Sequence, residues 1–140
     1  MPVRTADAEW RGDLRTGVGD MQFDAYTGAY SFGSRFEEAP GTNPESLLGA
    51  AHAGCFSMAL SAMLADAGFP PTRVPTQARV TVDKVEGGFG ITKIALVCDA
   101  EVPNIDDAKF QEIAAAAKVG CPVSKALAAV PEITLTAKLV

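Results

Sequence analysis

The order of the predicted elements gives this chain an α+β fold. Strand-like segments fill the first third, a long apolar helix follows, and a hairpin, two shorter helices and a last strand complete the sequence. Because the helices do not alternate with single strands, a doubly wound parallel sheet is disfavoured. The chain has 140 residues, of which 48% are hydrophobic and 21% charged, which predicts a single domain over residues 1–140. A domain of this size buries a core without metal or disulfide staples.

The first third is expected to form strands separated by Gly and Asp. The candidate strands are Ala6–Arg11, Met21–Ala25 and Tyr30–Phe36. The loop that follows ends in a helix start with two alternative caps. Thr42 with Glu45 three residues later forms a capping-box pattern, whereas Asn43 is followed by a proline that suits the first helical position. In either case a long helix begins here, and Gly68 ends it.

The middle of this helix, Leu47–Ala65, contains no Asp, Glu, Lys or Arg and is long enough to span a bilayer. It consists mostly of Ala, Gly and Ser, and the acids Glu45 and Asp66 flank it where a membrane span would carry basic anchors. We therefore expect a buried helix of a soluble protein. Since a domain this small seldom encloses so apolar a helix completely, we expect a homodimer with the helix at or near the interface.

Alternating apolar residues and glycines mark the elements of the second half. Two alternating segments predict strands, and Gly87-Gly88 predicts the hairpin turn between them. A helix with two acids in its first turn, a short helix and a final strand follow. In order, these elements are expected at Ala78–Val82, Ile94–Val102, Asp106–Val119, from Pro122 to before Pro131, and Ile133–Val140.

The net charge and the cysteine content narrow the range of possible functions. The net charge is −5 and no run of Lys or Arg occurs, which argues against nucleic acid and anionic membranes as partners. Charges begin near the N-terminus and no apolar stretch follows, so we expect no secretory signal and a cytoplasmic location. In such a reducing compartment, paired cysteines are more often catalytic, redox-active or metal-bound than structural.

The three cysteines differ in their surroundings. Cys98 lies on the apolar face of its predicted strand and is expected to pack as a small hydrophobe. Cys121 stands between a helix-ending glycine and a proline, so it is either a thiol activated near a helix N-terminus or a turn residue. Cys55 lies mid-helix with His52 one turn before it. It is either a thiol held as thiolate by a nearby cation or a core cysteine beside a satisfied histidine.

Four blocks of sequence carry a family resemblance. They are FGSRFE (Phe32–Glu37), GTNPESLL (Gly41–Leu48), AAHAGCFSMAL (Ala50–Leu60) and CPVSKAL (Cys121–Leu127). In order and spacing they resemble the OsmC/Ohr family, the osmotically inducible protein C and organic hydroperoxide resistance proteins. The third block is more similar to the OsmC branch than to the Ohr branch, and the resemblance covers nearly the whole chain.

The resemblance implies a thiol peroxidase that reduces organic hydroperoxides to alcohols. Its fold would be α+β, with antiparallel-rich sheets around a long central helix in an intertwined homodimer. Cys55 would attack the peroxide and become a sulfenic acid, and Cys121 would condense with it to a disulfide. Arg35 would activate the thiol and Glu45 would orient Arg35, roles that suit a permanent cation and a bidentate carboxylate. No cofactor would be bound, and an external dithiol, dihydrolipoamide or a lipoylated protein, would be the reductant.

Helix geometry adds a prediction about Glu45. Glu45 and Cys55 lie ten residues apart on one predicted helix, which separates them by about 15 Å along the axis and about 80° around it. An Arg35 side chain in contact with Cys55 could hardly reach Glu45 of the same chain. We therefore expect Glu45 to reach the site from the partner subunit.

Other readings of the same residues stay open at this point. Apolar side chains expected near Cys55, at Phe56, Met58 and Met63, favour alkyl or lipid hydroperoxides over hydrogen peroxide. A non-enzymatic ligand-binding or stress protein of the same fold is an alternative, and so is a hydrolase with Cys55 as nucleophile and His52 as base. Metal binding and a Ser-His-Asp hydrolase are weakly supported, since the chain has a single histidine, no C-x-x-C pair and no G-x-S-x-G motif.

Overall fold

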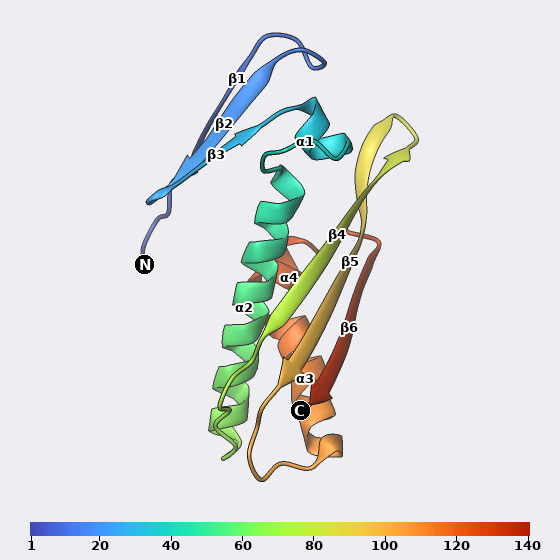
Figure 1. Ribbon diagram of the computed structural model, residues 1–140. Helices are drawn as coiled ribbons and strands as arrows, with labels where there is room; N and C mark the ends of the chain where they lie inside the picture. The colour runs from blue at the N-terminus through green and yellow to red at the C-terminus, as the bar shows by residue number, and fades with distance from the viewer. The chain divides into compact units, whose positions relative to one another are not determined.

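The computed structural model describes every residue, Met1–Val140, and its backbone groups into two compact units, Met1–Leu47 and Leu48–Val140. Figure 1 labels their elements. Each unit has its own three-stranded sheet, and the long helix α2 (Pro44–Asp66) contributes residues to both. The predicted α+β class is confirmed, while a single domain over the whole chain stays a prediction.

The N-terminal unit contains an antiparallel meander. Its strands, in sheet order, are β1 (Asp7–Arg11), β2 (Val18–Phe23) and β3 (Tyr26–Tyr30). The first predicted strand is confirmed almost residue for residue, and the second begins earlier than predicted. Trp10 packs against Tyr30 on one face of this sheet, with ring centroids 5.3 Å apart.

The predicted third strand, Tyr30–Phe36, is wrong, because β3 ends at Tyr30 and a short helix, α1 (Phe32–Phe36), follows. A reciprocal capping box starts this helix: the Ser34 amide donates to Ser31 Oγ at 3.1 Å, and the Ser31 amide donates to Ser34 Oγ at 2.8 Å. Ser34 Oγ also donates to the Thr42 carbonyl at 2.7 Å. These local bonds satisfy helix amides and outweigh the strand-like aromatic composition.

The long helix α2 starts at the second of its two predicted caps. The Ser46 amide donates to Asn43 Oδ1 at 2.7 Å, and Pro44 is the first helical residue. The helix ends near the predicted glycine, since Gly68 has a φ of +90°, a conformation that glycine adopts without strain.

The C-terminal unit contains the predicted hairpin and a third strand. β4 (Thr76–Val85) and β5 (Gly88–Ala100) pair antiparallel, and Gly87 and Gly88 at their turn have φ values of 85° and 146°. β6 (Glu132–Leu139) lies beside β5 and pairs with it in parallel. This parallel pairing is possible because two helices carry the chain back between β5 and β6.

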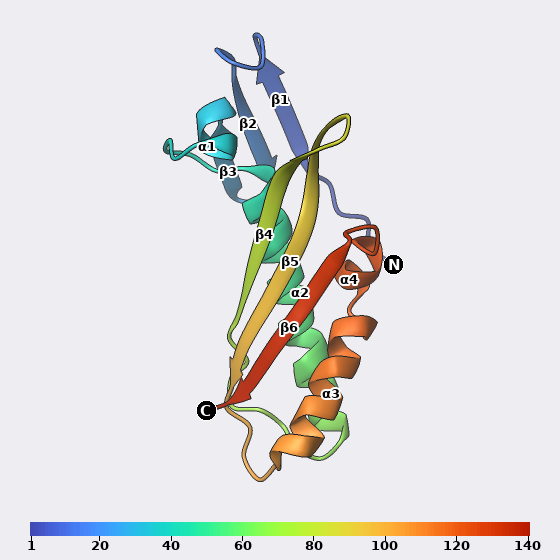
Figure 2. The ribbon, with the colours of Figure 1, turned by 90° about the vertical axis from the view of Figure 1, so that its right-hand side faces the viewer.

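Those helices are α3 (Asp107–Gly120) and α4 (Pro122–Ala126), and both were predicted. Asp106 caps α3 by accepting from the Lys109 amide at 2.8 Å. Figure 2 shows α2 and α3 behind the sheet, so both helices cover the same face. The hydrophobic core lies between them and the sheet. Its buried members include Phe56, Leu60 and Leu64 of α2, Ile94, Leu96, Cys98 and Ala100 of β5, and Phe110, Ala114 and Ala117 of α3.

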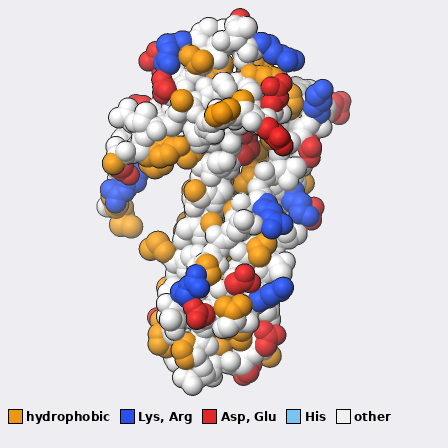
Figure 3. Space-filling view, viewed as in Figure 1, with side chains coloured by type: hydrophobic (Ala, Val, Ile, Leu, Met, Phe, Trp, Pro, Cys, Tyr) orange, Lys and Arg blue, Asp and Glu red, His pale blue; other side chains and the backbone are white.

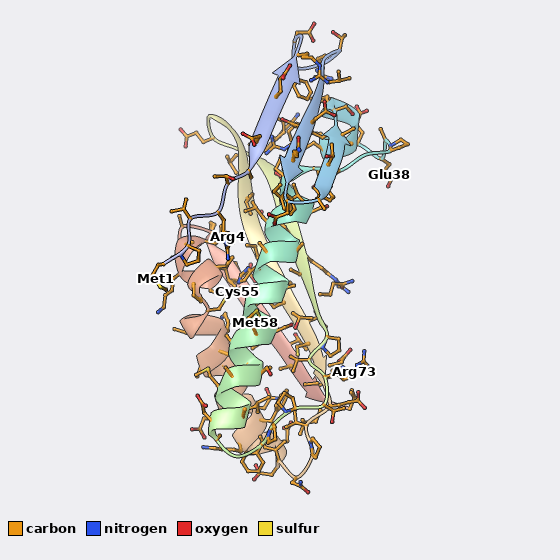
Figure 4. The ribbon with its side chains drawn as sticks, turned by 90° about the vertical axis from the view of Figure 1, so that its left-hand side faces the viewer. Met1, Arg4, Glu38, Cys55, Met58 and Arg73 are labelled. Atoms are coloured by element: carbon orange, nitrogen blue, oxygen red, sulfur yellow. The ribbon has the colours of Figure 1, made fainter.

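The opposite face of α2 is uncovered within the chain. Its exposed residues are all small or apolar: Ala51, Gly54, Met58, Ala62 and Ala65. Met58 is 77% exposed, and Figure 4 shows it on the side of α2 turned away from the sheet. By length and composition alone, α2 qualifies as a membrane-spanning helix. Its other face, however, packs into the core of a folded unit, as the helix of a soluble protein does.

Candidate functional site

The structure brings Cys55 and Cys121 together. Cys55 lies on α2, on the edge nearer to α4 in Figure 4, and Cys121 occupies the single position between α3 and α4. Their thiols are within hydrogen-bonding contact, and both are free. Pro122 is the first residue of α4, so α3 and α4 are two separate helices rather than one continuous helix. This break points the Cys121 side chain back towards α2. The two thiols can therefore form a disulfide without a large rearrangement.

The two thiols differ in their ionisation. Burial raises the pKa of Cys55, and the neighbouring Cys121 sulfur raises it further. Burial also opposes ionisation of Cys121, but hydrogen bonds from Cys55, from the Ser124 hydroxyl and from backbone amides outweigh it and lower the Cys121 pKa. Within one chain these effects favour the charged form of Cys121 over that of Cys55, and no cation stabilises a Cys55 thiolate.

His52 is not that cation. It is fully buried, and its Nε2 lies 2.7 Å from Ser124 Oγ. Burial lowers its pKa, so the ring is neutral near pH 7. Because its Nε2 is engaged by Ser124, His52 does not serve as a base for Cys55, and the hydrolase alternative loses its second residue. Ser124 was not predicted as a site residue. The sequence feature that could have indicated Ser124 is its position three residues after Cys121, at the start of a helix.

Cys98 behaves as predicted. It is fully buried on β5 and belongs to the hydrophobic core. Burial raises its pKa, although a hydrogen bond involving Thr76 partly offsets the effect. A buried thiol of raised pKa is a poor nucleophile, so Cys98 is a packing residue.

Arg35 and Glu45 form the predicted forked ion pair inside the N-terminal unit. Arg35 Nη2 lies 2.8 Å from Glu45 Oε1, and Arg35 Nε lies 3.2 and 3.3 Å from the two carboxylate oxygens. Glu45 is 6% exposed and stands in the first turn of α2, where the helix N-terminus also favours its charge. Both residues belong to one chain. An Arg35 held by Glu45 therefore comes from the same subunit as Glu45, and the expectation that Glu45 reaches the site from the partner subunit stays a prediction.

Arg35 also lines a cavity of about 410 Å³ in the N-terminal unit. The cavity is mainly aromatic, and its walls come from Trp10, Gly12, Leu14, Tyr30, Ser31, Phe32, Arg35 and Phe36. None of the three apolar residues expected near Cys55 (Phe56, Met58 and Met63) lines this cavity. Phe56 is fully buried in the core, and Met58 is on the uncovered face of α2.

The chain contains no cluster of three or more His, Cys, Asp or Glu side chains that could hold a metal ion. The groups available for chemistry are a pair of thiols in contact and a guanidinium that a carboxylate holds in place beside an apolar cavity. On an α+β scaffold with a long central helix, these features place the chain in the class of proteins that bring two cysteine thiols into contact.

Comparison with known proteins identifies the family. Residues 36–136 match the family described as "OsmC-like protein", and the chain belongs to this family. It is 50% identical over 139 residues to Peroxiredoxin OsmC of Escherichia coli (strain K12), a match that spans 97% of this chain and 96% of that protein. It is 35% identical over 97 residues to the organic hydroperoxide resistance protein of Xanthomonas axonopodis pv. citri (strain 306), spanning 69% and 66% of the two chains.

Solved structures show the same fold. The organic hydroperoxide resistance protein OhrB of Bacillus subtilis matches with a TM-score of 0.72 and 27% identity, over 97% of this chain and 98% of that one. An OsmC-like protein from Mycoplasma pneumoniae matches with a TM-score of 0.74 and 18% identity, over 99% and 98%. The predicted OsmC/Ohr-like fold is therefore confirmed.

Proposed function

We propose that the protein is a cysteine-based peroxidase that reduces organic hydroperoxides to alcohols. The observation that carries the proposal is the contact between Cys55 and Cys121, two free thiols from separate elements. The names of the relatives, a peroxiredoxin and an organic hydroperoxide resistance protein, support it.

The proposed reaction has two steps. The Cys55 thiolate attacks the terminal oxygen of the hydroperoxide, so that an S–O bond forms and the O–O bond breaks. Cys55 becomes a sulfenic acid, and the alkoxide takes up a proton and leaves as the alcohol. The Cys121 thiolate then attacks Cys55. An S–S bond forms, the S–O bond breaks, and the departing hydroxide takes up a proton to give water. The two thiols have thereby supplied two electrons to the peroxide.

The first step needs a cation that Cys55 lacks within its own chain. The pKa of Cys55 is raised there by burial and by Cys121. Arg35 can supply the charge, and it is held ready by Glu45. Because Glu45 and Cys55 lie about 15 Å apart along one helix, an Arg35 paired with Glu45 fits the Cys55 of a partner subunit better than its own. In this proposal both Arg35 and Glu45 therefore come from the partner.

The uncovered face of α2 supports such a homodimer. It is a continuous stripe of small and apolar residues without a charge, with Met58 at its centre. Small residues let a second helix or sheet approach closely. Burying this stripe against a second copy removes apolar surface from water at about 25 cal/mol per Å². An active site shared between subunits would then form where α2 meets its partner.

The aromatic cavity beside Arg35 supports an organic substrate. Its walls suit an alkyl or aryl group, while Arg35 can donate hydrogen bonds to the peroxide oxygens. In this arrangement the hydrocarbon part of the hydroperoxide fills the cavity and its O–O bond lies at the guanidinium. Hydrogen peroxide has no such part and gains nothing from the cavity.

We further propose an external dithiol, dihydrolipoamide or a lipoylated protein, as the reductant that reopens the disulfide by thiol exchange. The protein would act in the cytoplasm, where thiols are kept reduced. In Figure 3, acidic and basic side chains are interspersed over the visible face without a patch of one sign. This surface, with a net charge of −5, gives nucleic acid and membranes nothing to bind electrostatically.

The test is turnover of cumene hydroperoxide with dihydrolipoamide by the wild type and single cysteine variants. We expect Cys55→Ser to be inactive and Cys121→Ser to stop after sulfenic acid formation and over-oxidise. Cys98→Ala, which removes the packing thiol, serves as the control and should turn over normally. Full activity in Cys55→Ser, or no turnover by the wild type with any dithiol, would refute the proposal and favour a non-enzymatic binding protein.

A further inference from the structure

The two sulfurs of the thiol pair differ in how far the chain encloses them. Cys121 is fully buried, with 0% of its surface exposed, whereas Cys55 on α2 is partly exposed. In a disulfide formed between them, a reductant would meet one sulfur that it can reach and one that it cannot. Thiol–disulfide exchange requires contact with the sulfur under attack, so access decides which sulfur the reductant bonds to.

The backbone of Cys121 is fixed on both sides. Its amide donates to the Ala117 carbonyl at 2.9 Å, and its carbonyl accepts from the Lys125 amide at 3.1 Å. Ala117 is itself fully buried in the core. Cys121 thus forms the junction of α3 and α4, and we expect its thiol to reach solvent only when α4 moves away from α2.

A buried hydrogen bond holds α4 against α2. His52 Nε2 on α2 lies 2.7 Å from Ser124 Oγ on α4, and His52 is fully buried while Ser124 is 8% exposed. The other ring nitrogen, His52 Nδ1, is buried without a hydrogen-bond partner. Separating the two helices would break the one hydrogen bond that the ring makes, so this bond favours the docked position of α4.

Packing at the far end of α4 acts in the same direction. Leu127, the residue after α4, and Val130 pack against the hydrophobic core. α4 is thus held at its start by the backbone of Cys121, in its middle by Ser124 and at its end by Leu127. A segment held in this way opens rarely, and the exposure of Cys121 depends on that opening.

We propose that the reductant attacks the Cys55 sulfur rather than Cys121, and that the bond between His52 and Ser124 enforces this choice by keeping α4 docked. The inference rests on the proposed peroxidase function, in which the hydroperoxide already has a route to Cys55. His52 and Ser124 are then positioning residues, and hydroperoxide and dithiol approach the same sulfur in turn.

The exchange has two steps. A thiolate of the external dithiol attacks the Cys55 sulfur, so that a new S–S bond forms, the bond to Cys121 breaks, and Cys121 leaves as a thiolate that takes up a proton. The second thiolate of the dithiol then attacks the reductant sulfur of this mixed disulfide. That step closes the reductant to a cyclic disulfide and releases Cys55 as a thiolate, so the dithiol supplies both electrons.

The test identifies the sulfur that carries the mixed disulfide. The Cys98→Ala chain is oxidised with diamide, which needs no peroxide, and is treated briefly with the monothiol glutathione. Acid stops the exchange, N-ethylmaleimide alkylates the remaining thiol, and mass spectrometry locates both groups. We expect glutathione on Cys55 and maleimide on Cys121, in about tenfold excess or more over the reverse arrangement, because Cys121 reacts only in molecules whose α4 has opened. Equal amounts, or the reverse excess, would overturn the inference.

A matched pair of variants tests the hydrogen bond itself. Ser124→Thr keeps a hydroxyl for His52 and should give the parent distribution. Ser124→Val has the same shape without the hydroxyl, and it should raise the share of glutathione on Cys121 about fivefold, the factor expected for loss of one hydrogen bond. Equal distributions in the two variants would show that the bond does not enclose Cys121.

Single-cysteine chains make a second measurement that does not depend on the disulfide. Cys121 is the one thiol of a Cys55→Ser, Cys98→Ala chain, and Cys55 is the one thiol of a Cys121→Ser, Cys98→Ala chain. Alkylation by N-ethylmaleimide is compared with that of the same chain in urea, at high pH where both thiols are ionised. We expect folding to slow the reaction of Cys121 at least about tenfold more than that of Cys55.

The two measurements separate this inference from the proposed function. Equal protection of the two thiols would contradict the inference, whether or not diamide forms the disulfide. If the disulfide failed to form while the difference in protection held, the peroxidase proposal would be refuted and the enclosure of Cys121 upheld.

Discussion

At the scale of single residues, the two thiols in contact differ in how strongly their surroundings favour the thiolate form. Cys55 has the raised pKa and Cys121 the lowered one, within one chain. In the proposed reaction Cys55 attacks the peroxide as a thiolate, so a cation has to reach Cys55 from outside its own surroundings. Arg35 is suited to this because Glu45 removes most of the cost of ordering its side chain.

Replacing Arg35 should therefore shift the reaction to higher pH. Without the cation, the pKa of Cys55 stays raised, so the thiolate fraction at neutral pH falls and recovers only as the pH rises through that pKa. We expect Arg35→Ala to slow sulfenic acid formation about tenfold or more, the effect of losing about 1.5–3 kcal/mol of charge-assisted bonding. Stopped-flow oxidation by cumene hydroperoxide across a pH series measures both effects.

A second arginine of the same unit provides the control. Arg15 stacks on Phe32, 4.3 Å from the ring centroid, and it is not paired with an acid in the way that Arg35 is. Arg15→Ala removes a cation near the same cavity and should leave the pH profile in place. A profile that moves equally in both variants would show a general field effect rather than a role of Arg35.

The role of a residue was predictable only where that role depends on its neighbours in the sequence. The Cys98 packing role followed from strand alternation, and the Asn43 cap followed from its neighbours. The bond between His52 and Ser124 joins residues 72 positions apart, so no local pattern contains it. Its detection therefore required the fold.

At the scale of elements, hydrogen bonds at the helix N-termini stabilise much of the local structure. α1 is only five residues long, too short to be stable by propensity alone. It exists because Ser31 and Ser34 cap each other and Ser34 also holds the Thr42 carbonyl. This helix carries Arg35, so its capping positions the guanidinium.

Ser34→Ala should accordingly loosen the N-terminal unit. We expect a loss of about 1–2 kcal/mol in the free energy of unfolding, the usual cost of removing a buried capping hydroxyl. The fluorescence of Trp10, the one tryptophan of the chain and a member of this unit, reports the transition in urea. Ser46→Ala is the matched control, since Ser46 is exposed and only its backbone takes part in a cap. Equal midpoints for the two variants would contradict the capping role.

The elements themselves were largely predictable, with one instructive failure. Glycines and prolines fixed the ends of α2, the hairpin turn and the break before α4, because their backbone preferences are strong and local. The segment after β3 was read as a strand from its aromatic residues. A reciprocal pair of serine caps is weaker in sequence than an aromatic run, and here it was decisive.

At the scale of the whole molecule, the sequence predicted a helix too apolar to be covered by one chain, and α2 has an uncovered stripe. It could not show that Arg35 pairs with Glu45 of its own chain, because that pair depends on where α1 places the guanidinium. The pairing changes the proposed division of the active site. In the proposed dimer, one subunit supplies both thiols and its partner supplies both charged residues.

That division predicts complementation between an inactive variant, Cys55→Ser, and a slowed one, Arg35→Ala. Cys55→Ser keeps Arg35, and Arg35→Ala keeps Cys55, so a mixed dimer contains one site with an intact thiol from one subunit and an intact arginine from the other. After random exchange of subunits between equal amounts of the two variants, about one site in four should be complete, and the mixture should be more active than the two variants measured separately. A site built within one chain would show no restoration at any mixing ratio.

A charge placed in the uncovered stripe of α2 tests whether the restored activity comes from dimers. Met58→Glu in both variants places a charge at the centre of that stripe, where dimerisation would bury it without a partner. We expect light scattering to show monomers and the mixture to show no gain of activity over the separate variants. Ala116→Glu adds the same charge at an exposed position of α3 and should leave both the dimer and the restored activity intact. If the Met58→Glu proteins still formed dimers and complemented each other, α2 would not be the interface, and the cation at Cys55 would have to reach it by another route.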